Sequence, residues 1–408
     1  MKSSKSYDIP KHLFVKAFKR VKANKGAPGV DGQSIEIFES NLENNLYKLW
    51  NRMSSGSYFP QAVRLCEIPK GRTGTRTLGI PTVRDRVAQM VVKQVLEPRL
   101  EAIFSENSYG YRPGRSAVEA VGQARGNCWD MNWVIDMDIK GFFDTIDHEL
   151  MLKALRCHAK EKWIDLYVRR WLEAPAYTEN GTQAVRDRGT PQGGVISPLL
   201  ANLFLHYALD RWVEEHFPSL PFERYADDII IHCYTEKQAR YVLHQVQERL
   251  EECGLSLNER KTRIVYCKDS NRKGPAKDKK FDFLGFEFRP RLVRNSKDGH
   301  FFVSFSPAIS PKSAKSIRRQ IRSWKMTKRT PMTLKDIALA INPAIRGWFS
   351  YYGSFCPSAL SKLKPYIDRC IAFWVMRKFK SLHRRFVGAI RWLRDVRRSS
   401  PRLFAHWA

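Results

Sequence analysis

Hydrophobic and polar positions follow two different periods along this chain of 408 residues. Apolar residues recur at helical spacing in 199–215 and 239–252, which predicts amphipathic helices there. Short apolar runs rich in Ile, Val or Phe predict β-strands at 133–139, 229–233 and 281–288. Helices and strands therefore occur together in one chain, which indicates mixed α/β structure.

The predicted strand 133–139 ("WVIDMDI") carries two acidic residues. Because side chains alternate along a strand, Asp136 and Asp138 would share one face with Val134. A single aspartate at a strand end is commonly a cap, so this pattern alone assigns no chemistry.

Two adjacent carboxylates lie in the apolar stretch 222–233 ("FERYADDIIIHC"). The pattern predicts a strand, a tight turn and a second strand, with Asp227 and Asp228 at the turn. Like charges in an apolar setting are unfavourable unless a cation neutralises them. Together with Asp138, the pair would form a cluster of oxygen ligands that suits Mg²⁺. A plain turn is the alternative interpretation of this stretch taken by itself.

The charge of the chain favours a polyanionic partner. There are 71 Lys and Arg against 41 Asp and Glu, a formal net charge of +30, and nucleic acid is the usual partner of so basic a chain. Residues 311–408 alone contain 23 Lys and Arg and 3 acidic residues, a net charge of +20. A membrane partner is disfavoured, since no lipidation motif and no apolar run of spanning length occurs in the sequence.

The composition also changes along the chain. A Ser/Pro-rich stretch near 310 precedes a basic helical pattern, so we expect a domain boundary there. Residues 268–280 ("KDSNRKGPAKDKK") are polar without a period, which is typical of an exposed loop. The eight scattered cysteines favour a reducing compartment, and residues 1–20 lack the apolar block of a signal peptide. We therefore expect a cytoplasmic protein associated with nucleic acid.

Several motifs occur in an order that resembles one known family. Those before the acidic pair are "NKGAPGVDG" (24–32), "EIPKGRTGTRTLGIPTVRDR" (67–86), "SYGYRPGRSA" (108–117), "IDMDIKGFFDTID" (135–147) and "GTPQGGVISPLLANLFL" (189–205). Those after it are "GLSLNERKT" (254–262), "FDFLGFEF" (281–288) and "IRGWFSYYG" (345–353). Each is weak alone, but together they resemble the bacterial group II intron-encoded reverse transcriptase/maturase family over most of the chain. No Cys-rich endonuclease module precedes the final "PRLFAHWA", so we expect the endonuclease-lacking type.

The resemblance implies a right-hand polymerase of the α+β fold class, with RNA-directed DNA polymerase activity. An N-terminal extension and fingers would span 1–130, and a palm with an antiparallel sheet 131–300, with a finger insertion at about 150–185. A basic helical thumb, called domain X in maturases, would span 310–408. The implied substrates are an RNA template, a DNA primer and deoxynucleoside triphosphates, used with two Mg²⁺ ions or with Mn²⁺ in their place. Group II intron RNA would be a further partner, bound to assist splicing and mobility.

Two other functions are compatible with the resemblance. A domesticated relative would use the same chemistry in DNA repair or phage defence. A splicing-only maturase would bind RNA without polymerase activity, but such proteins lose residues that are present here, such as Gln192 and Lys70. The oligomeric state is not predicted.

The resemblance also implies the catalytic residues. Asp138, Asp227 and Asp228 would be the metal-binding triad, and Ile139 would offer its backbone carbonyl. Asp136 is the alternative to Asp138. The family's ligand directly precedes a hydrophobic-Lys-Gly-x-Phe-Asp run, which selects Asp138.

Phe143 resembles the residue that excludes ribonucleotides. An apolar ring beneath the sugar leaves neither room nor a partner for a 2′-hydroxyl. The alternative is that Phe142 and Phe143 are both core residues, while Asp144 is expected to cap or brace a helix start.

A basic hairpin is expected to bind the triphosphate. Lys70 and Arg76 flank a turn that contains glycine, with Arg64 as a third candidate. A solvated basic surface is the alternative. Gln192 can donate and accept hydrogen bonds, and Gly193 would let the backbone approach the incoming base and sugar.

Lys261 matches the residue proposed in polymerases as proton donor to the departing pyrophosphate, and a surface salt bridge is the alternative. The primer grip is expected in "FLGF", at Phe283, Leu284 and Gly285, where ordinary core packing is the alternative. His406 is expected to be structural, as are most aromatic residues after 310.

Overall fold

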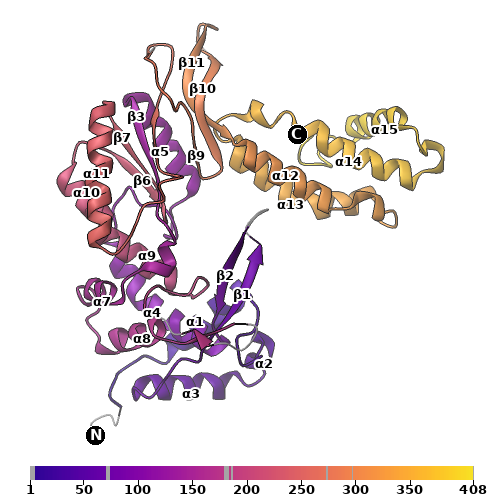
Figure 1. Ribbon diagram of the computed structural model, residues 1–408. Helices are drawn as coiled ribbons and strands as arrows, with labels where there is room; N and C mark the ends of the chain where they lie inside the picture. Colours follow the sequence, from indigo (N-terminus) through magenta and orange to yellow (C-terminus); the bar gives the residue numbers. More distant parts are fainter. Residues whose placement is uncertain are drawn as a thin grey trace. The chain divides into compact units, whose positions relative to one another are not determined.

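The computed structural model of the chain describes residues 5–69, 74–178, 183–184, 187–272, 274–295 and 297–407. The chain combines many helices with small sheets that contain antiparallel hairpins (Figure 1), which confirms the α+β class. The chain divides into two compact units. Unit 1 comprises Met1–Ser116, Met137–Ile231 and Arg240–Arg263, and unit 2 comprises Ala117–Asp136, His232–Ala239 and Ile264–Ala408.

Short strands form three sheets in the described part of the chain. They are β1 (Val63–Pro69), β2 (Thr75–Ile80), β3 (Trp133–Asp138), β4 (Ala176–Tyr177), β5 (Gln183–Ala184), β6 (Phe222–Tyr225), β7 (Asp228–Cys233), β8 (Arg263–Tyr266), β9 (Phe281–Phe283), β10 (Phe286–Arg294) and β11 (Phe301–Ile309). The strand orders are β2-β1-β4-β5, β6-β7-β3-β8 and β11-β10-β9. The hairpins β1–β2, β6–β7 and β10–β11 are antiparallel.

Helices fill most of the remaining chain. Those before residue 260 are α1 (His12–Asn24), α2 (Ile35–Glu39), α3 (Leu42–Ser54), α4 (Val83–Glu101), α5 (Ala117–Asp130), α6 (Phe142–Thr145), α7 (His148–Arg156), α8 (Lys162–Leu172), α9 (Ser197–Leu205), α10 (Arg211–His216) and α11 (Glu236–Glu252). Phe14, Phe18 and Val21 form the buried face of α1, which packs against α4. The hydroxyl of Thr82, two residues after β2, accepts from the backbone N–H of Asp85 and so fixes the start of α4.

Both predicted helices are confirmed, one of them with an irregular turn. The segment 239–252 lies within α11, whereas 199–215 forms α9 and α10 joined by a π-helical turn, His206–Asp210. A π turn leaves backbone carbonyls without their usual helical partners. Arg249 compensates by donating to the carbonyls of Tyr207 and Ala208, each at 3.2 Å.

The predicted single strand at 281–288 is wrong, because this segment folds into a hairpin. Phe283 pairs with Phe286, so Leu284 and Gly285 form a two-residue turn between β9 and β10. Both turn residues have positive φ, 50° and 81°. Such turns match the twist of the flanking strands, and glycine adopts this backbone without strain.

The segment 268–280 is irregular as predicted, but it is not fully exposed. Arg272 is half-buried and donates from Nη1 to the carbonyls of Cys128, at 2.7 Å, and Cys267, at 3.0 Å. These bonds fasten this part of the segment to the end of α5. A polar composition alone does not distinguish a solvated loop from one held by backbone carbonyls.

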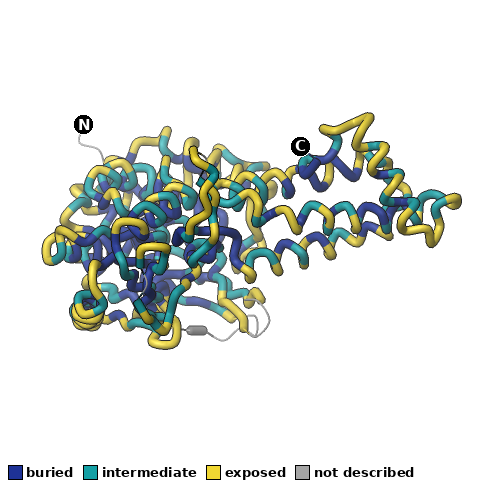
Figure 2. The backbone as a smooth tube through the Cα atoms, turned by 90° about the horizontal axis from the view of Figure 1, so that it is seen from above, coloured by how far each residue is buried: buried dark blue, intermediate teal, exposed yellow. Residues whose placement is uncertain are grey.

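The chain after residue 310 is helical, as predicted. Its helices are α12 (Pro311–Ser323), α13 (Leu334–Gly353), α14 (Leu363–Lys378) and α15 (Phe386–Ser399). Ser310 caps α12 by accepting from the backbone N–H of Ser313. Apolar residues at helical spacing, such as Ile341 and Ile371, form a shared core, so that buried and exposed positions alternate along each helix (Figure 2). None of the described helices combines the length and apolar character needed to cross a bilayer.

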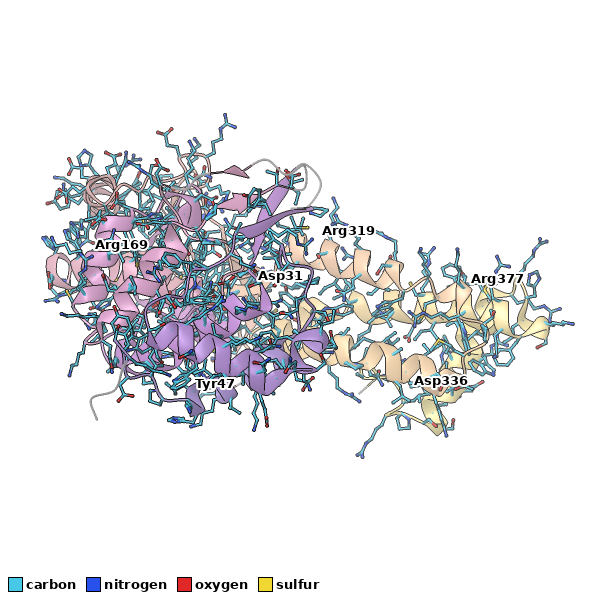
Figure 3. The ribbon with its side chains drawn as sticks, turned by 90° about the horizontal axis from the view of Figure 1, so that it is seen from below. Asp31, Tyr47, Arg169, Arg319, Asp336 and Arg377 are labelled. Carbon is cyan, nitrogen blue, oxygen red and sulfur yellow. The ribbon has the colours of Figure 1, made fainter. Side chains whose placement is uncertain are left out.

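The basic residues of these helices and their aromatic residues lie in different environments. Arg319 of α12 and Arg377 of α14 are exposed (Figure 3). Trp324 and Trp348 stack with ring centroids 5.7 Å apart against the apolar core, which confirms the core prediction for these aromatics. His406 is completely buried and its Nε2 lies 2.8 Å from Asp368 Oδ1, as expected of a structural histidine.

Candidate active site

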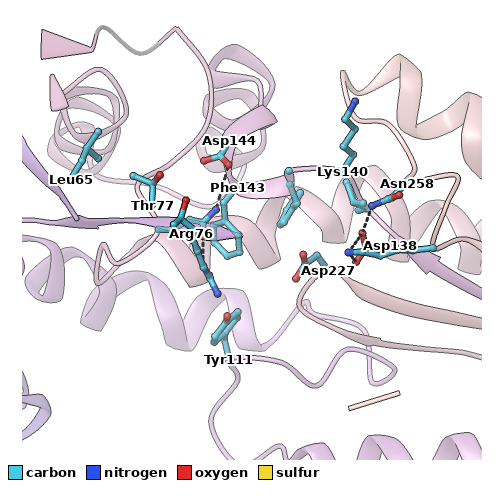
Figure 4. A pocket seen from close by; sticks show the side chains of 16 residues that line it. Leu65, Arg76, Thr77, Tyr111, Asp138, Lys140, Phe143, Asp144, Asp227 and Asn258 are labelled. Atoms are coloured by element: carbon cyan, nitrogen blue, oxygen red, sulfur yellow. Dashed lines mark hydrogen bonds and ion pairs between the residues drawn. The ribbon is translucent and has the colours of Figure 1, made fainter. Parts of the chain in front are cut away.

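Unit 1 contains an open, mostly polar pocket of about 630 Å³. Its lining comes from the β1–β2 hairpin, the end of β3 with the following turn and α6, the β6–β7 turn, and the loops around residues 111, 192 and 258–261. Figure 4 shows Asp138 and Asp227 close together on one side, with Arg76, Phe143 and Asp144 on the other. A concave site lined by both acidic and basic side chains suits a charged substrate.

Asp138 is held at the end of β3 by residues distant in sequence. Lys261 Nζ lies 2.8 Å from both of its carboxylate oxygens. The Asn258 side chain donates to Oδ2 at 3.2 Å, and the Asn258 backbone N–H donates to the Asp138 carbonyl at 2.8 Å. Asp138 lines the pocket and Asp136 does not, which agrees with the choice made from the sequence.

The hairpin predicted at 222–233 is confirmed, with one correction to its turn. Tyr225 pairs with Asp228, so the two turn residues are Ala226 and Asp227, and Asp228 is the first residue of β7. Ala226 has a φ of 58°, a left-handed conformation that is rare for residues other than glycine. The turn carries Asp227 into the pocket.

The carboxylates of the pocket repel each other. Burial raises the pKa of Asp227, and the negative charge of Asp138 raises it further. Asp228 is exposed and absent from the pocket lining, although its charge and that of Asp227 contribute to the raised pKa of Tyr111. Among the described residues, no three His, Cys, Asp or Glu side chains are grouped closely enough to hold one metal ion. Of the three carboxylates predicted to bind metal, the structure thus brings Asp138 and Asp227 into one pocket and leaves Asp228 outside its lining.

Arg224 stabilises the β6–β7 turn that carries Asp227, a role that the sequence did not suggest. Its guanidinium donates to both carboxylate oxygens of Asp210, at 2.6 and 2.5 Å, and neither side chain is exposed. Its Nη1 also donates to Asn202 Oδ1 at 3.0 Å and to the carbonyl of Ala226 at 3.2 Å. The arginine thus connects the turn to α9 and to the π turn. In the sequence, the arginine that precedes the two aspartates of "RYADD" within an apolar stretch was the signal that could have suggested a buried ion pair.

The loop around residue 110 packs directly against the same turn. A Cβ on Gly110 would lie 2.5 Å from the backbone nitrogen of Ala226, so only glycine fits. The Gly110 carbonyl accepts from Asn202 Nδ2 at 2.7 Å. Next along the chain, Tyr111 lines the pocket. The motif "SYGYRPGRSA" had signalled the family without suggesting this role.

Arg76 and Gln192 meet at the opposite side of the pocket. Arg76 Nε donates to Gln192 Oε1 at 2.5 Å, and Gln192 Nε2 donates to Asp144 Oδ2 at 3.4 Å. All three line the pocket. We expected Asp144 to cap or brace a helix start; it caps neither neighbouring helix, because Gly141 is the N-cap position of α6 and Asp147 caps α7 by accepting from Leu150 N–H. Asp144 instead lies in the single turn of α6, where its carboxylate accepts from Gln192.

Phe142, Phe143 and Ile139 are mostly buried and also line the pocket. The two phenylalanine rings meet edge to face with centroids 5.4 Å apart. The first residue after β3, Ile139, forms an isolated antiparallel bridge to Leu257. Phe143 is therefore both a packed residue and part of the pocket wall.

Several predicted residues lie outside this lining. Lys70 falls outside the described residues. Arg64 Nη2 donates to the carbonyl of Pro28 at 2.8 Å, so this guanidinium is used in the N-terminal loop. Gly193 is required by packing on β2, since a Cβ there would lie 2.4 Å from the Gly79 carbonyl.

The predicted primer grip lies in unit 2, at the β9–β10 turn. Tyr351 Oη donates to the carbonyl of Leu284 at 2.8 Å, and Ser313 Oγ donates to that of Gly285 at 2.9 Å. Phe283 is buried. The turn is therefore fixed by helices α12 and α13.

Two family models match the chain. Residues 68–288, more than half of it, match the family "Reverse transcriptase (RNA-dependent DNA polymerase)". Residues 314–392 match "Group II intron, maturase-specific domain".

Proteins from bacteria and from yeast are similar to the chain. Protein YkfC of Escherichia coli (strain K12) is 32% identical over 316 residues, which cover 67% of this chain and 78% of that protein. The group II intron-encoded protein LtrA of Lactococcus lactis subsp. cremoris is 31% identical over 245 residues, covering 59% of this chain but 40% of LtrA. The putative COX1/OXI3 intron 1 protein of Saccharomyces cerevisiae is 27% identical over 327 residues, covering 67% of this chain and 38% of that protein. The chain therefore belongs to the reverse transcriptase (RNA-dependent DNA polymerase) family and carries a group II intron maturase-specific domain.

Proposed function

We propose that the protein is the reverse transcriptase of a group II intron, which extends a DNA primer on an RNA template with deoxynucleoside triphosphates. One observation carries the proposal: Asp138 and Asp227 share a pocket with Arg76 and Lys261. Two carboxylates that can hold metal, with cations in the same pocket, match the needs of phosphoryl transfer, in which charge develops on several oxygens at once.

Asp138 and Asp227 are the residues that would hold divalent metal, with Asp228 and the Ile139 carbonyl as further ligands. The pair fits a hard cation, because two carboxylates share one pocket and the pKa of Asp227 is raised by burial and by the negative charge of Asp138, although Arg76 and Lys261 act in the opposite direction. We propose Mg²⁺ as the ion, with Mn²⁺ as a substitute. Two such ions, when bound, would stabilise the attacking and leaving oxygens of the transfer.

The remaining pocket residues would bind the nucleotide. Arg76 uses Nε to hold Gln192, and a guanidinium has four further N–H groups with which to bind a triphosphate. Lys261 neutralises Asp138 and carries on Nζ the proton that we propose is given to the departing pyrophosphate. Phe143 would lie beneath the sugar.

Fingers, palm and thumb are proposed at 1–130, 131–300 and 310–408, with the basic helices of the last segment binding intron RNA. The match of 314–392 to the maturase-specific domain supports this assignment. A cytoplasmic location is part of the proposal. Crosslinking the protein in its native cells and sequencing the attached RNA should recover a group II intron, and RNA without any intron sequence would contradict the maturase role.

Primer extension tests the proposed reaction. A DNA primer annealed to an RNA template should be extended with deoxynucleotides and Mg²⁺, stop when EDTA removes the metal, and resume with Mn²⁺. Failure to extend the primer on RNA under any of these ionic conditions would contradict the assignment.

Replacing Phe143 by Ala should relax the choice of sugar. Removal of the ring opens space beside the nucleotide, so we expect incorporation of ribonucleotides to rise by about 10-fold or more relative to deoxynucleotides. Competition between the two nucleotide types on one primer–template measures the ratio. Phe204→Ala is the matched control, since it removes a buried ring that is not part of the pocket lining, and it should leave the ratio unchanged. An unaltered ratio in Phe143→Ala would rule out the gate.

A further inference from the structure

Unit 2 contains a pocket of about 610 Å³ that the polymerase reaction does not use. It is lined by residues of β10, of helix α5 and of the turn at 355–359. Both α5 and β10 are labelled in Figure 1. Four arginines line it: Arg125 from α5, and Arg289, Arg291 and Arg294 from β10. Four guanidinium groups around one concavity point to an anionic ligand.

Arg125 presents a donor that the protein leaves unused. Its guanidinium lies over two rings, 4.8 Å from the centroid of Trp129 and 5.1 Å from that of Phe355. Its Nε is buried and has no hydrogen-bond partner among the described residues. Buried donors without acceptors are unfavourable, so a ligand oxygen at this position would stabilise the arrangement.

The charges of the pocket are only partly balanced by the protein. One carboxylate, that of Glu287, serves both Arg289, at 2.9 Å, and Arg291, at 3.5 Å. Lys280 is a third cation near it, at 3.8 Å. Burial and the charge of Arg289 lower the pKa of Arg291, which an anion beside the guanidinium would raise again.

We propose that this pocket binds the phosphodiester backbone of an RNA strand. Planar guanidinium groups match phosphate oxygens in pairs, and Phe355 and the exposed Leu292 offer apolar surface for a base or sugar. RNA is favoured over an acidic protein because 355–359 lies within the segment that matches the group II intron maturase-specific domain. The inference rests on the proposed function, because it assigns a surface to the RNA that the protein would recognise.

Binding of a fluorescein-labelled RNA hairpin to the full chain tests the site. We expect Arg125→Gln/Arg291→Gln to weaken binding by about 10- to 100-fold and to lower the salt dependence, d log K/d log [salt], by about 1 to 2 in magnitude. The matched control is Arg169→Gln/Arg211→Gln, which removes two charges from ion-paired surface arginines of unit 1. It should change affinity by less than about threefold.

Three further measurements separate loss of the RNA site from misfolding, from loss of polymerase activity and from binding of any polyanion. A second double variant, Arg289→Gln/Arg294→Gln, changes two exposed residues of the same pocket. It should reproduce the loss of RNA affinity even if Arg125 and Arg291 are needed for folding. Extension of a short primer on poly(rA) should be normal in all these variants, so a failure of the polymerase assignment remains distinguishable. Affinity and salt dependence equal to those of the control would overturn the proposal. An equal loss of binding to polyglutamate would overturn the assignment to RNA.

Discussion

An Asp227→Ala variant should lose primer extension by about 10²- to 10³-fold or more while it still binds RNA. Asp227 and Asp138 are the two predicted metal-binding carboxylates that line the pocket, whereas the third carboxylate of the lining, that of Asp144, contacts Gln192. Loss of either one removes oxygen ligands at the point where negative charge must be neutralised.

The same substitution should not destabilise the protein. A raised pKa means that the folded state disfavours the charged form of Asp227, so removing the carboxylate removes an unfavourable charge. We expect an unchanged or slightly higher melting temperature. Asp144→Ala is the matched control, since this carboxylate lines the same pocket but contacts Gln192, and it should keep most of the maximal rate. Normal extension by Asp227→Ala would refute the catalytic assignment.

Replacing Arg224 by Met should lower the free energy of unfolding by about 3–5 kcal/mol. The change leaves the Asp210 carboxylate buried without its bidentate partner. It also removes the donors to Asn202 and to the Ala226 carbonyl, which fix the β6–β7 turn. The free energy of unfolding from chemical denaturation and the rate of primer extension should therefore both decrease.

A double variant separates stability from positioning. Arg224→Met/Asp210→Leu replaces a buried ion pair by apolar side chains and should recover most of the lost stability. It does not restore the hydrogen bond to the turn, so extension should stay low. Arg211→Met, which breaks an exposed pair with Glu215, should cost less than about 0.5 kcal/mol. Stability of Arg224→Met within about 1 kcal/mol of the unaltered chain would contradict the role given to the pair.

The sequence predicted those features that depend on local pattern. A short apolar run identified β3, and the apolar–Asp–Asp–apolar order identified the β6–β7 hairpin. The same reasoning misplaced the turn by one residue, because a left-handed Ala226 cannot be inferred from composition. It also missed the hairpin within 281–288, where Leu284 adopts positive φ beside Gly285.

Contacts between distant segments were beyond such reasoning. Asp138 meets Lys261 and Asn258 across more than a hundred residues of sequence, and only the fold brings them together. Arg64 illustrates the converse case: its charge suggested a phosphate contact, whereas the structure places it outside the pocket lining, with Nη2 donating to the carbonyl of Pro28. Residue type indicates which chemistry is available, whereas tertiary packing decides where it is placed.

Anomalous diffraction from crystals of the protein with primer–template, a deoxynucleotide and Mn²⁺ would test the metal site most directly. Manganese peaks should lie within about 2.0–2.3 Å of carboxylate oxygens of both Asp138 and Asp227, with Lys261 displaced from Asp138. Peaks bonded to neither carboxylate, with the ammonium of Lys261 still in place, would contradict a two-metal mechanism at this pocket.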